Sequence, residues 1–157
     1  MSLFVNENPI LGDGTTIRSA AALGDFKPQF EEYIAVVNLV AASATSQDFF
    51  IAAPGQNYQV TGVTVTFGVT STSGTVDIKK CTGTQAATAG TSVLTGTISL
   101  SGTANTPVQG TLSSTTANIQ LTGGPVSAPV FDRLALVLAG TLTGLVDCLV
   151  QVRLKRI

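Results

Sequence analysis

The stretch YQVTGVTVTFGV, residues 58–69, gives the clearest structural signal in this chain of 157 residues. From Val63 onward every second residue is apolar, and the residues between them are threonine or glycine. Successive side chains of a β-strand point to opposite faces of its sheet. The alternation therefore predicts a core strand with one buried face and one face in water. The residues expected on the buried face are Val63, Val65, Phe67 and Val69.

A second alternating run, residues 75–80, follows after a turn predicted at residues 70–74. Its apolar residues, Val76 and Ile78, are expected to point inward, while the charged residues between them point outward. Two such runs joined by a short turn are typical of a β-hairpin. We therefore expect residues 58–69 and 75–80 to pair with each other.

Seven further strands are predicted, each bounded by Gly, Asn, Pro or Ser. They cover residues 33–40, 49–52, 92–100, 108–113, 118–122, 133–140 and 146–156. No amphipathic helix is expected between them, and the 23 Thr residues suit the pleated surface of a sheet. The sequence thus predicts an all-β fold. We expect a jelly-roll or Greek-key-like β-sandwich over residues 33–157, with an extended N-terminal arm over residues 1–32.

The N-terminal arm differs in composition from the rest of the chain. It holds five acidic and two basic residues, and its apolar residues follow no period of 2 or 3.6. Such a segment is either a loose leader or an arm that docks on a neighbouring subunit. Its apolar content favours the docked arm. The predicted contact residues are Phe4, Val5, Ile10, Leu11, Ile17, Phe26 and Phe30.

The composition argues against several classes of function. The chain has no histidine, so it lacks the usual base of a hydrolytic triad and the imidazole metal ligand. Its net charge of −1 does not favour nucleic-acid binding. No apolar run suits a membrane span, and the N-terminus shows no signal-peptide pattern. We expect a soluble protein made in the cytosol, with no enzymatic activity, no metal, no cofactor, and neither nucleic acid nor membrane as partner.

Aspartates and cysteines of the β region are the remaining candidates for chemistry. Catalytic carboxylates must meet in one cleft, but here the acids stand one per segment, which favours solvated side chains. These acids are Asp48, Asp77, Asp132 and Asp147. Cys81 and Cys148 match no metal or redox spacing. Buried thiols are the favoured interpretation, and a disulfide is the alternative.

Two loops and the basic C-terminus are candidate interaction surfaces. Residues 81–91 and 122–132 form the long loops, and long loops at the ends of a sandwich often carry recognition. Arg153, Lys155 and Arg156 lie close together at the C-terminus. They either meet the acidic arm of a neighbour or protect an edge strand from aggregation.

An ordered set of phrases in the second half of the chain resembles a known family. The phrases are KKCTGTQA (79–86), AGTSVL (89–94), GTANTPV (102–108), DRLALVLAGT (132–141) and VRLKRI (152–157). Together they resemble small virion proteins of tailed bacteriophages, of the head decoration or cement type. The resemblance covers about residues 58–157 and includes no catalytic signature.

The resemblance implies a structural protein of the virion, made in the host cytoplasm. Such a jelly-roll-like subunit binds the outer surface of a phage capsid, often as a homotrimer, and ties neighbouring major capsid subunits together. The implied partners are the major capsid protein and further copies of this chain. The alternative is a receptor- or carbohydrate-binding β-sandwich module of a phage tail or fibre. Binding to empty capsids or to host glycans distinguishes the two.

Overall fold

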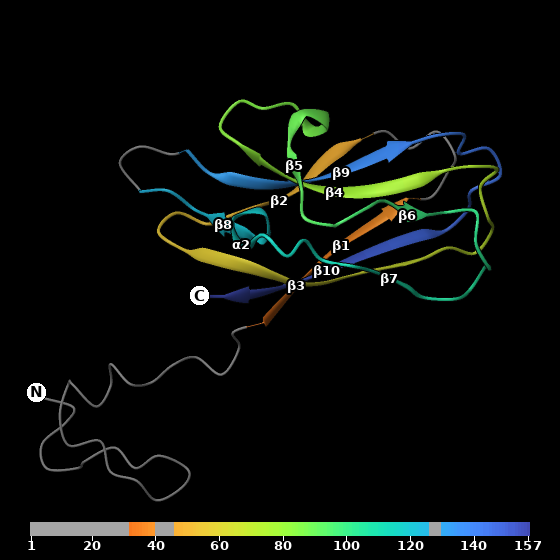
Figure 1. Ribbon diagram of the computed structural model, residues 1–157, viewed down its shortest axis with the longest axis horizontal. Helices are drawn as coiled ribbons and strands as arrows, with labels where there is room; N and C mark the ends of the chain where they lie inside the picture. The colour runs from red at the N-terminus through yellow and green to blue at the C-terminus, as the bar shows by residue number, and fades with distance from the viewer. Residues whose placement is uncertain (1–31, 40–45, 126–129) are drawn as a thin grey trace, which may run out of the picture. The chain divides into compact units, whose positions relative to one another are not determined.

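The secondary structure of the computed structural model is mainly β over the residues that it describes, 32–39, 46–125 and 130–157 (Figure 1). The longer strands are β1 (Glu32–Leu39), β2 (Gln47–Ile51), β3 (Asn57–Thr66), β4 (Thr75–Thr82), β9 (Asp132–Ala139) and β10 (Cys148–Arg156). The short strands are β5 (Thr91–Ser92), β6 (Ile98–Ser99), β7 (Val108–Gly110) and β8 (Gln120–Thr122). Two single helical turns, η1 (Ala87–Ala89) and α2 (Thr116–Ile119), accompany them.

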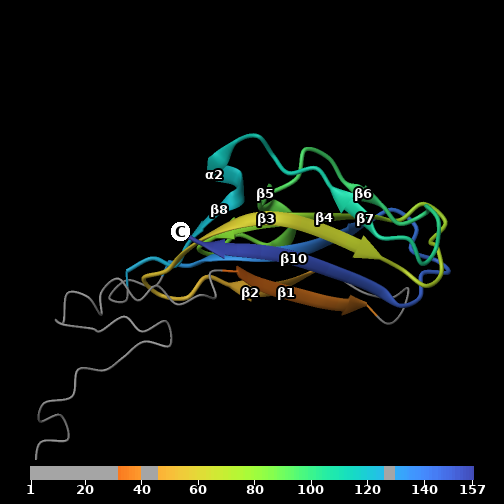
Figure 2. The same ribbon diagram turned by 90° about the horizontal axis from the view of Figure 1, so that it is seen from below.

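The strands form two antiparallel sheets that pack face to face (Figures 1 and 2). The first sheet has the order β1-β10-β3-β7, and β8 also pairs with β3. The second sheet has the order β2-β9-β4-β5, and β6 also pairs with β4. The predicted all-β sandwich is confirmed.

The strand order is that of a jelly roll. β1 pairs with β10 and β2 with β9, while β3 pairs with β7 and β8, and β4 with β5 and β6. The chain thus forms one long antiparallel ribbon whose successive pairs alternate between the two sheets. The pairs β10 with β3 and β9 with β4 then close each sheet. Two sheets built in this way are the hallmark of the jelly-roll architecture.

The core lies between the sheets, and β3 contributes to it as predicted. Val63, Val65 and Phe67 are all at most 1% exposed. Val69 was expected beside them but is 49% exposed. That part of the prediction is wrong because β3 ends at Thr66, and Val69 makes only an isolated bridge beyond the sheet.

A β-bulge explains why the apolar alternation of β3 begins at Val63. Arg153 on β10 lies opposite Gly62, but the next residue of β10 lies opposite Val60. Thr61 is therefore the extra residue, and an extra residue in a strand reverses which face the following side chains occupy. As a result both Val60 and Val63 point into the core.

The predicted hairpin between residues 58–69 and 75–80 is wrong. β3 belongs to the first sheet and β4 to the second. The connection crosses from one sheet to the other instead of turning back, and it is fixed there by a bond from the Ser71 amide to the Leu100 carbonyl (2.9 Å). Alternation identifies the buried face of a strand but does not identify the strand that pairs with it. The buried faces of β3 and β4 point toward each other across the core because the two strands lie in different sheets.

The predicted strand at residues 92–100 is interrupted in the structure. The Ser92 hydroxyl bonds to the backbone N–H and carbonyl of Leu94, both at 3.0 Å, which turns the chain out of the second sheet. Leu94 then bridges Leu112 near the first sheet before β6 returns to β4. The strands expected at 108–113 and 118–122 are shorter than predicted, ending at Gly110 and starting after α2.

Candidate interaction surface

The contact residues predicted in the arm, Phe4 to Phe30, lie outside the residues that the structure describes. β1 begins at Glu32, one residue before the predicted boundary of the sandwich. Tyr33 of β1 is 41% exposed, and its ring contacts that of Tyr58 edge-on at 5.8 Å between ring centroids. Phe50 of the other sheet contacts the same tyrosine at 5.4 Å. Aromatic contacts therefore join the start of β1 to β3 and β2.

Three connections meet at one end of the sandwich, which we call the loop end (Figure 1). They are the β2–β3, β4–β5 and β8–β9 connections. The Gly55 amide donates to the Gly124 carbonyl (2.9 Å), and the Gly123 amide donates to the Gln56 carbonyl (2.8 Å). A Cβ on Gly123 would lie 1.7 Å from the carbonyl oxygen of Ala53, so only glycine fits there. This contact holds the β2–β3 and β8–β9 connections together.

Asp132 fastens the bases of two of these connections. Its carboxylate is buried and accepts a 2.6 Å bond from the Thr82 hydroxyl and a 2.9 Å bond from the Thr122 amide. Asp77 is also buried and accepts a 2.6 Å bond from the Ser92 hydroxyl. The expectation that these aspartates are solvated is wrong for both. Hydroxyl and amide donors offset the cost of burying the two carboxylates.

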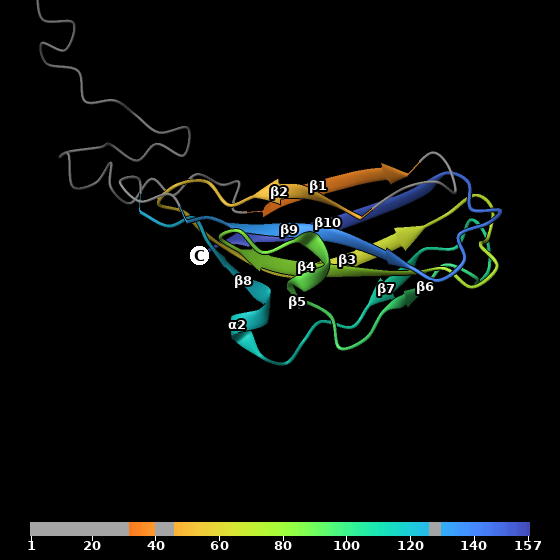
Figure 3. The ribbon, with the colours of Figure 1, turned by 90° about the horizontal axis from the view of Figure 1, so that it is seen from above.

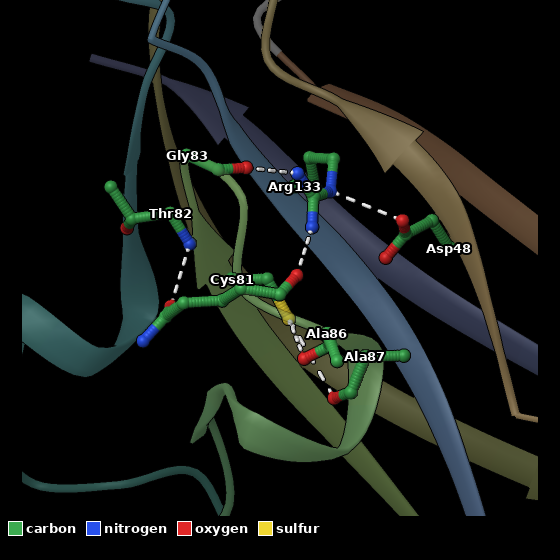
Figure 4. A network of polar contacts seen from close by, with 8 residues as sticks. Asp48, Cys81, Thr82, Gly83, Ala86, Ala87 and Arg133 are labelled. Atoms are coloured by element: carbon green, nitrogen blue, oxygen red, sulfur yellow. Dashed lines mark hydrogen bonds and ion pairs between the residues drawn. The ribbon is translucent and has the colours of Figure 1, made fainter.

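Arg133 fixes the β4–β5 connection from the other side (Figure 4). Its guanidinium donates to the carbonyl oxygens of Gly83 and Gln85. Its Nε lies 3.1 Å from the Asp48 carboxylate, in an ion pair without hydrogen-bond geometry. Residues 82–85, 122 and 132–133 thus form one polar network at the loop end.

The two cysteines are free and buried, as favoured from the sequence, and the disulfide alternative is wrong. Cys81 lies on the outer side of β4 under η1, and its Sγ is 3.6 Å from the carbonyls of Ala86 and Ala87 (Figure 4). Burial, and next the Asp48 carboxylate, raise the pKa of this thiol above its ordinary value. Cys148 lies in the core, where burial raises the pKa of the thiol to about 11. Both thiols are protonated at neutral pH, which disfavours nucleophilic chemistry.

Two lysines hold helical turns against the second sheet. Lys79 donates to the Thr88 carbonyl in η1 (2.8 Å), and Lys80 donates to the Ala117 carbonyl in α2. The ammonium groups of both lysines of β4 are thus hydrogen-bonded to backbone carbonyl oxygens.

β1 is an edge strand with exposed apolar side chains. Ile34 is 62% exposed and Val36 is 53% exposed. Their neighbours across the pairing with β10 are Arg153 and Gln151, which are exposed on the same face. The guanidinium of Arg153 lies over Gly62 of β3. The outer face of β1 and β10 is thus a mixed apolar and basic surface.

The loop end also presents apolar side chains to solvent. Ile51 at the end of β2 and Val130 beside Gly83 are both more than half exposed. Ile157 is 53% exposed, and its amide donates to the Asn57 carbonyl at the start of β3. These three residues come from three different elements, and all lie near the polar network that fixes the loops.

A cleft of about 400 Å³ is lined by residues of β6 and β7 and of the segments beside them. β6 and β7 lie at the margin of the sandwich away from β1 and β2 (Figure 3). The lining combines hydroxyl and amide side chains with Ile98, Val108 and three glycines, and includes no charged or aromatic residue. Thr95, Thr97, Ser99, Gln109 and Thr111 are its polar residues. Such a lining offers hydrogen bonds to a neutral ligand and none of the usual groups for acid–base chemistry.

Sequence reasoning missed the network around Asp132. Of the four predicted acids, Asp48 pairs with Arg133 and Asp147 stays exposed, so the structure does not bring them into a catalytic pair. Within the described residues no group of three or more His, Cys, Asp or Glu side chains is placed to hold a metal ion. One feature of the sequence could have indicated this network. Only 11% of the residues are charged, yet two charged residues, Asp132 and Arg133, stand side by side at the end of a long predicted loop.

Comparison with known proteins adds no relative: no family model, no curated protein and no solved structure matches the chain. Among the described helices, none is long and apolar enough to cross a membrane.

Proposed function

We propose that this chain is a structural virion protein that binds the outer surface of a phage capsid and links neighbouring major capsid subunits. In this proposal it has no enzymatic activity, is made in the host cytoplasm and ends on the virion surface. The observation that carries the proposal is the structure of the loop end. There a polar network fixes the loops, and apolar side chains beside this network are exposed to solvent.

A surface of this kind suits permanent contact with another protein. Contact loops that are already fixed lose little conformational entropy on binding. Ile51, Val130 and Ile157 offer apolar area for such a contact. The resemblance to decoration proteins supports the same role.

Co-sedimentation with capsids that lack the protein tests the proposal. Val130→Asp places a charge at the centre of the loop end and should abolish co-sedimentation. Val69→Asp is the matched control, because Val69 is 49% exposed at the opposite end of the sandwich. Full binding by Val130→Asp, or equal loss in both variants, would contradict contact through the loop end.

The second candidate is a receptor- or carbohydrate-binding module of a phage tail or fibre. The hydroxyl-lined cleft between β6 and β7 favours it, because neutral sugars are bound through hydroxyl and amide groups. A glycan-binding assay distinguishes the candidates: binding that is lost in Gln109→Ala and kept in Val130→Asp would support the module and contradict the capsid protein.

A further inference from the structure

The four edges of the two sheets are protected very unequally. The edge formed by β7 and β8 and the edge formed by β5 and β6 consist of strands of two or three residues. β2 carries the charge of Asp48 and a bulge at residues 48–50. Short strands, charges and bulges are the usual means by which proteins prevent edge-to-edge pairing. β1 is long, has no bulge, and carries no charge after Glu32 at its first position.

β1 is eight residues long, EYIAVVNL, with neither lysine nor proline and with its one charge at the first position. Its register with β10 is continuous over all eight residues, and in the described part of the chain no strand pairs with its other side. A regular strand with exposed Ile34 and Val36 is a template for the addition of another strand. An edge of this kind in a native protein indicates a partner strand.

We propose that the partner strand is the N-terminal arm of a second copy, through the residues around Leu3, Phe4 and Val5. Val5 precedes Glu32 by 27 residues, and an extended chain covers roughly 3.3–3.6 Å per residue, so the arm can span up to about 90 Å. That reach extends well past the subunit from which the arm starts.

The residues nearest β1 in the chain are poorly suited to fold back on it. A hairpin onto the same β1 would use residues 20–29, which contain Gly24-Asp25 and Lys27-Pro28. Residue pairs of these types favour turns over strands. The distant apolar stretch Leu3–Val5 lacks such residues.

Charge favours the same partner. The residues before β1 hold four acids and two bases, whereas the face beside β1 carries Arg153 of β10. An acidic arm laid along β1 is thus attracted to the receiving sheet. Passing the arm from each copy to the next links copies head to tail, and such links form a closed ring when the rotation between copies closes.

A mixing experiment without capsids tests this exchange apart from the proposed function. Val36→Lys damages the receiving edge but keeps the arm, whereas deletion of residues 1–31 removes the arm but keeps the edge. The core lies entirely within residues 37–154, so the truncated protein should fold. Each variant alone should have the mass of its own monomer, which is 16.0 kDa for the full-length chain and less for the truncated one, and the mixture should form a 1:1 complex.

Light scattering and circular dichroism give the readout. The wild type should be oligomeric at every concentration measured, and Ile51→Lys, the matched control on β2, should remain so. If the Val36→Lys protein does not fold, Ile34→Lys serves as the second variant that damages the same edge. A monomeric wild type, an oligomeric edge variant, or a mixture that forms no complex would overturn the exchange, while leaving capsid binding to be judged by co-sedimentation.

Discussion

The Thr82 hydroxyl donates a 2.6 Å hydrogen bond to the buried carboxylate of Asp132, which lies 50 residues away in the sequence. The bond joins the end of β4 to the start of β9, directly opposite each other in the second sheet. The same carboxylate accepts the Thr122 amide, which belongs to the first sheet. One side chain thus connects both sheets where the long loops begin.

Removing this carboxylate should destabilise the protein. Asp132→Ala leaves the Thr82 hydroxyl and the Thr122 amide without their acceptor, and we expect a loss of about 1–3 kcal/mol in the free energy of unfolding. Asp132→Asn should cost less. The amide oxygen of Asn can accept the bond from the Thr122 N–H, and its NH2 group can donate to the Thr82 hydroxyl. Urea denaturation measures both, with Asp147→Asn as the exposed control. Equal stability of Asp132→Ala and the wild type would contradict a structural role.

The alternating strand provides a second test of stability. Phe67→Ala removes a side chain that is 1% exposed and should cost about 3–5 kcal/mol. Thr66→Ala, on the other face, should cost less than about 1 kcal/mol. Similar losses at the two positions in urea denaturation would mean that both faces of this strand are buried.

The results for β3 show which features of a strand can be predicted from the alternation of apolar and polar residues. It correctly predicted burial of Val63, Val65 and Phe67, because the period of a strand directly reflects which face is apolar. It gave the wrong partner strand, because pairing depends on how the ribbon folds across two sheets. The break after Ser92 could not be predicted either, because it depends on a side-chain bond to Leu94 that competes with the sheet.

Burial of charge was the least predictable feature of the candidate site. Asp77 and Asp132 are indistinguishable in sequence from solvated aspartates, because their donors come from Ser92, Thr82 and Thr122. All three donors belong to other strands, 50, 10 and 15 residues away from their acceptors. The arm residues stay a prediction, whereas the long loops were placed correctly between β4 and β5 and between β8 and β9.

Gly123 should be essential for the loop end. In Gly123→Ala the new Cβ would meet the backbone carbonyls of Ala53 and Gln56, which cannot move as a side chain can. We expect a loss of about 1–3 kcal/mol or more. Gly96→Ala is the control, because nothing lies within 4 Å of its Cβ position, and it should change stability by less than about 1 kcal/mol. Thermal unfolding compares the two; a stable Gly123→Ala protein would show that the loops can separate freely.

Stability should fall at alkaline pH through Cys148. Folding raises the pKa of this thiol from 9.0 to about 11, so the native state favours the protonated form. The contribution is therefore constant below pH 9 and is lost as the pH rises through about 11, amounting to about 2–3 kcal/mol. Urea denaturation under reducing conditions at pH 8 to 11 measures the slope. Cys148→Ala should have the shallower slope, and parallel curves would contradict the assignment.

Deletion of residues 1–31 should separate folding from attachment to capsids. All strands and core residues in the described part of the chain lie at or after Glu32, so circular dichroism should show an intact sandwich. Apolar arm residues contribute roughly 1.5–3 kcal/mol each when fully buried, against about 1 kcal/mol or less for an exposed charge pair. Losing several of them, and with them the linkage between copies, should weaken capsid binding by orders of magnitude. The loss should depend only weakly on salt, because most of the missing contact is apolar. Truncated protein that still co-sediments with capsids at full occupancy would show that the loop end binds alone and that the arm is a passive leader.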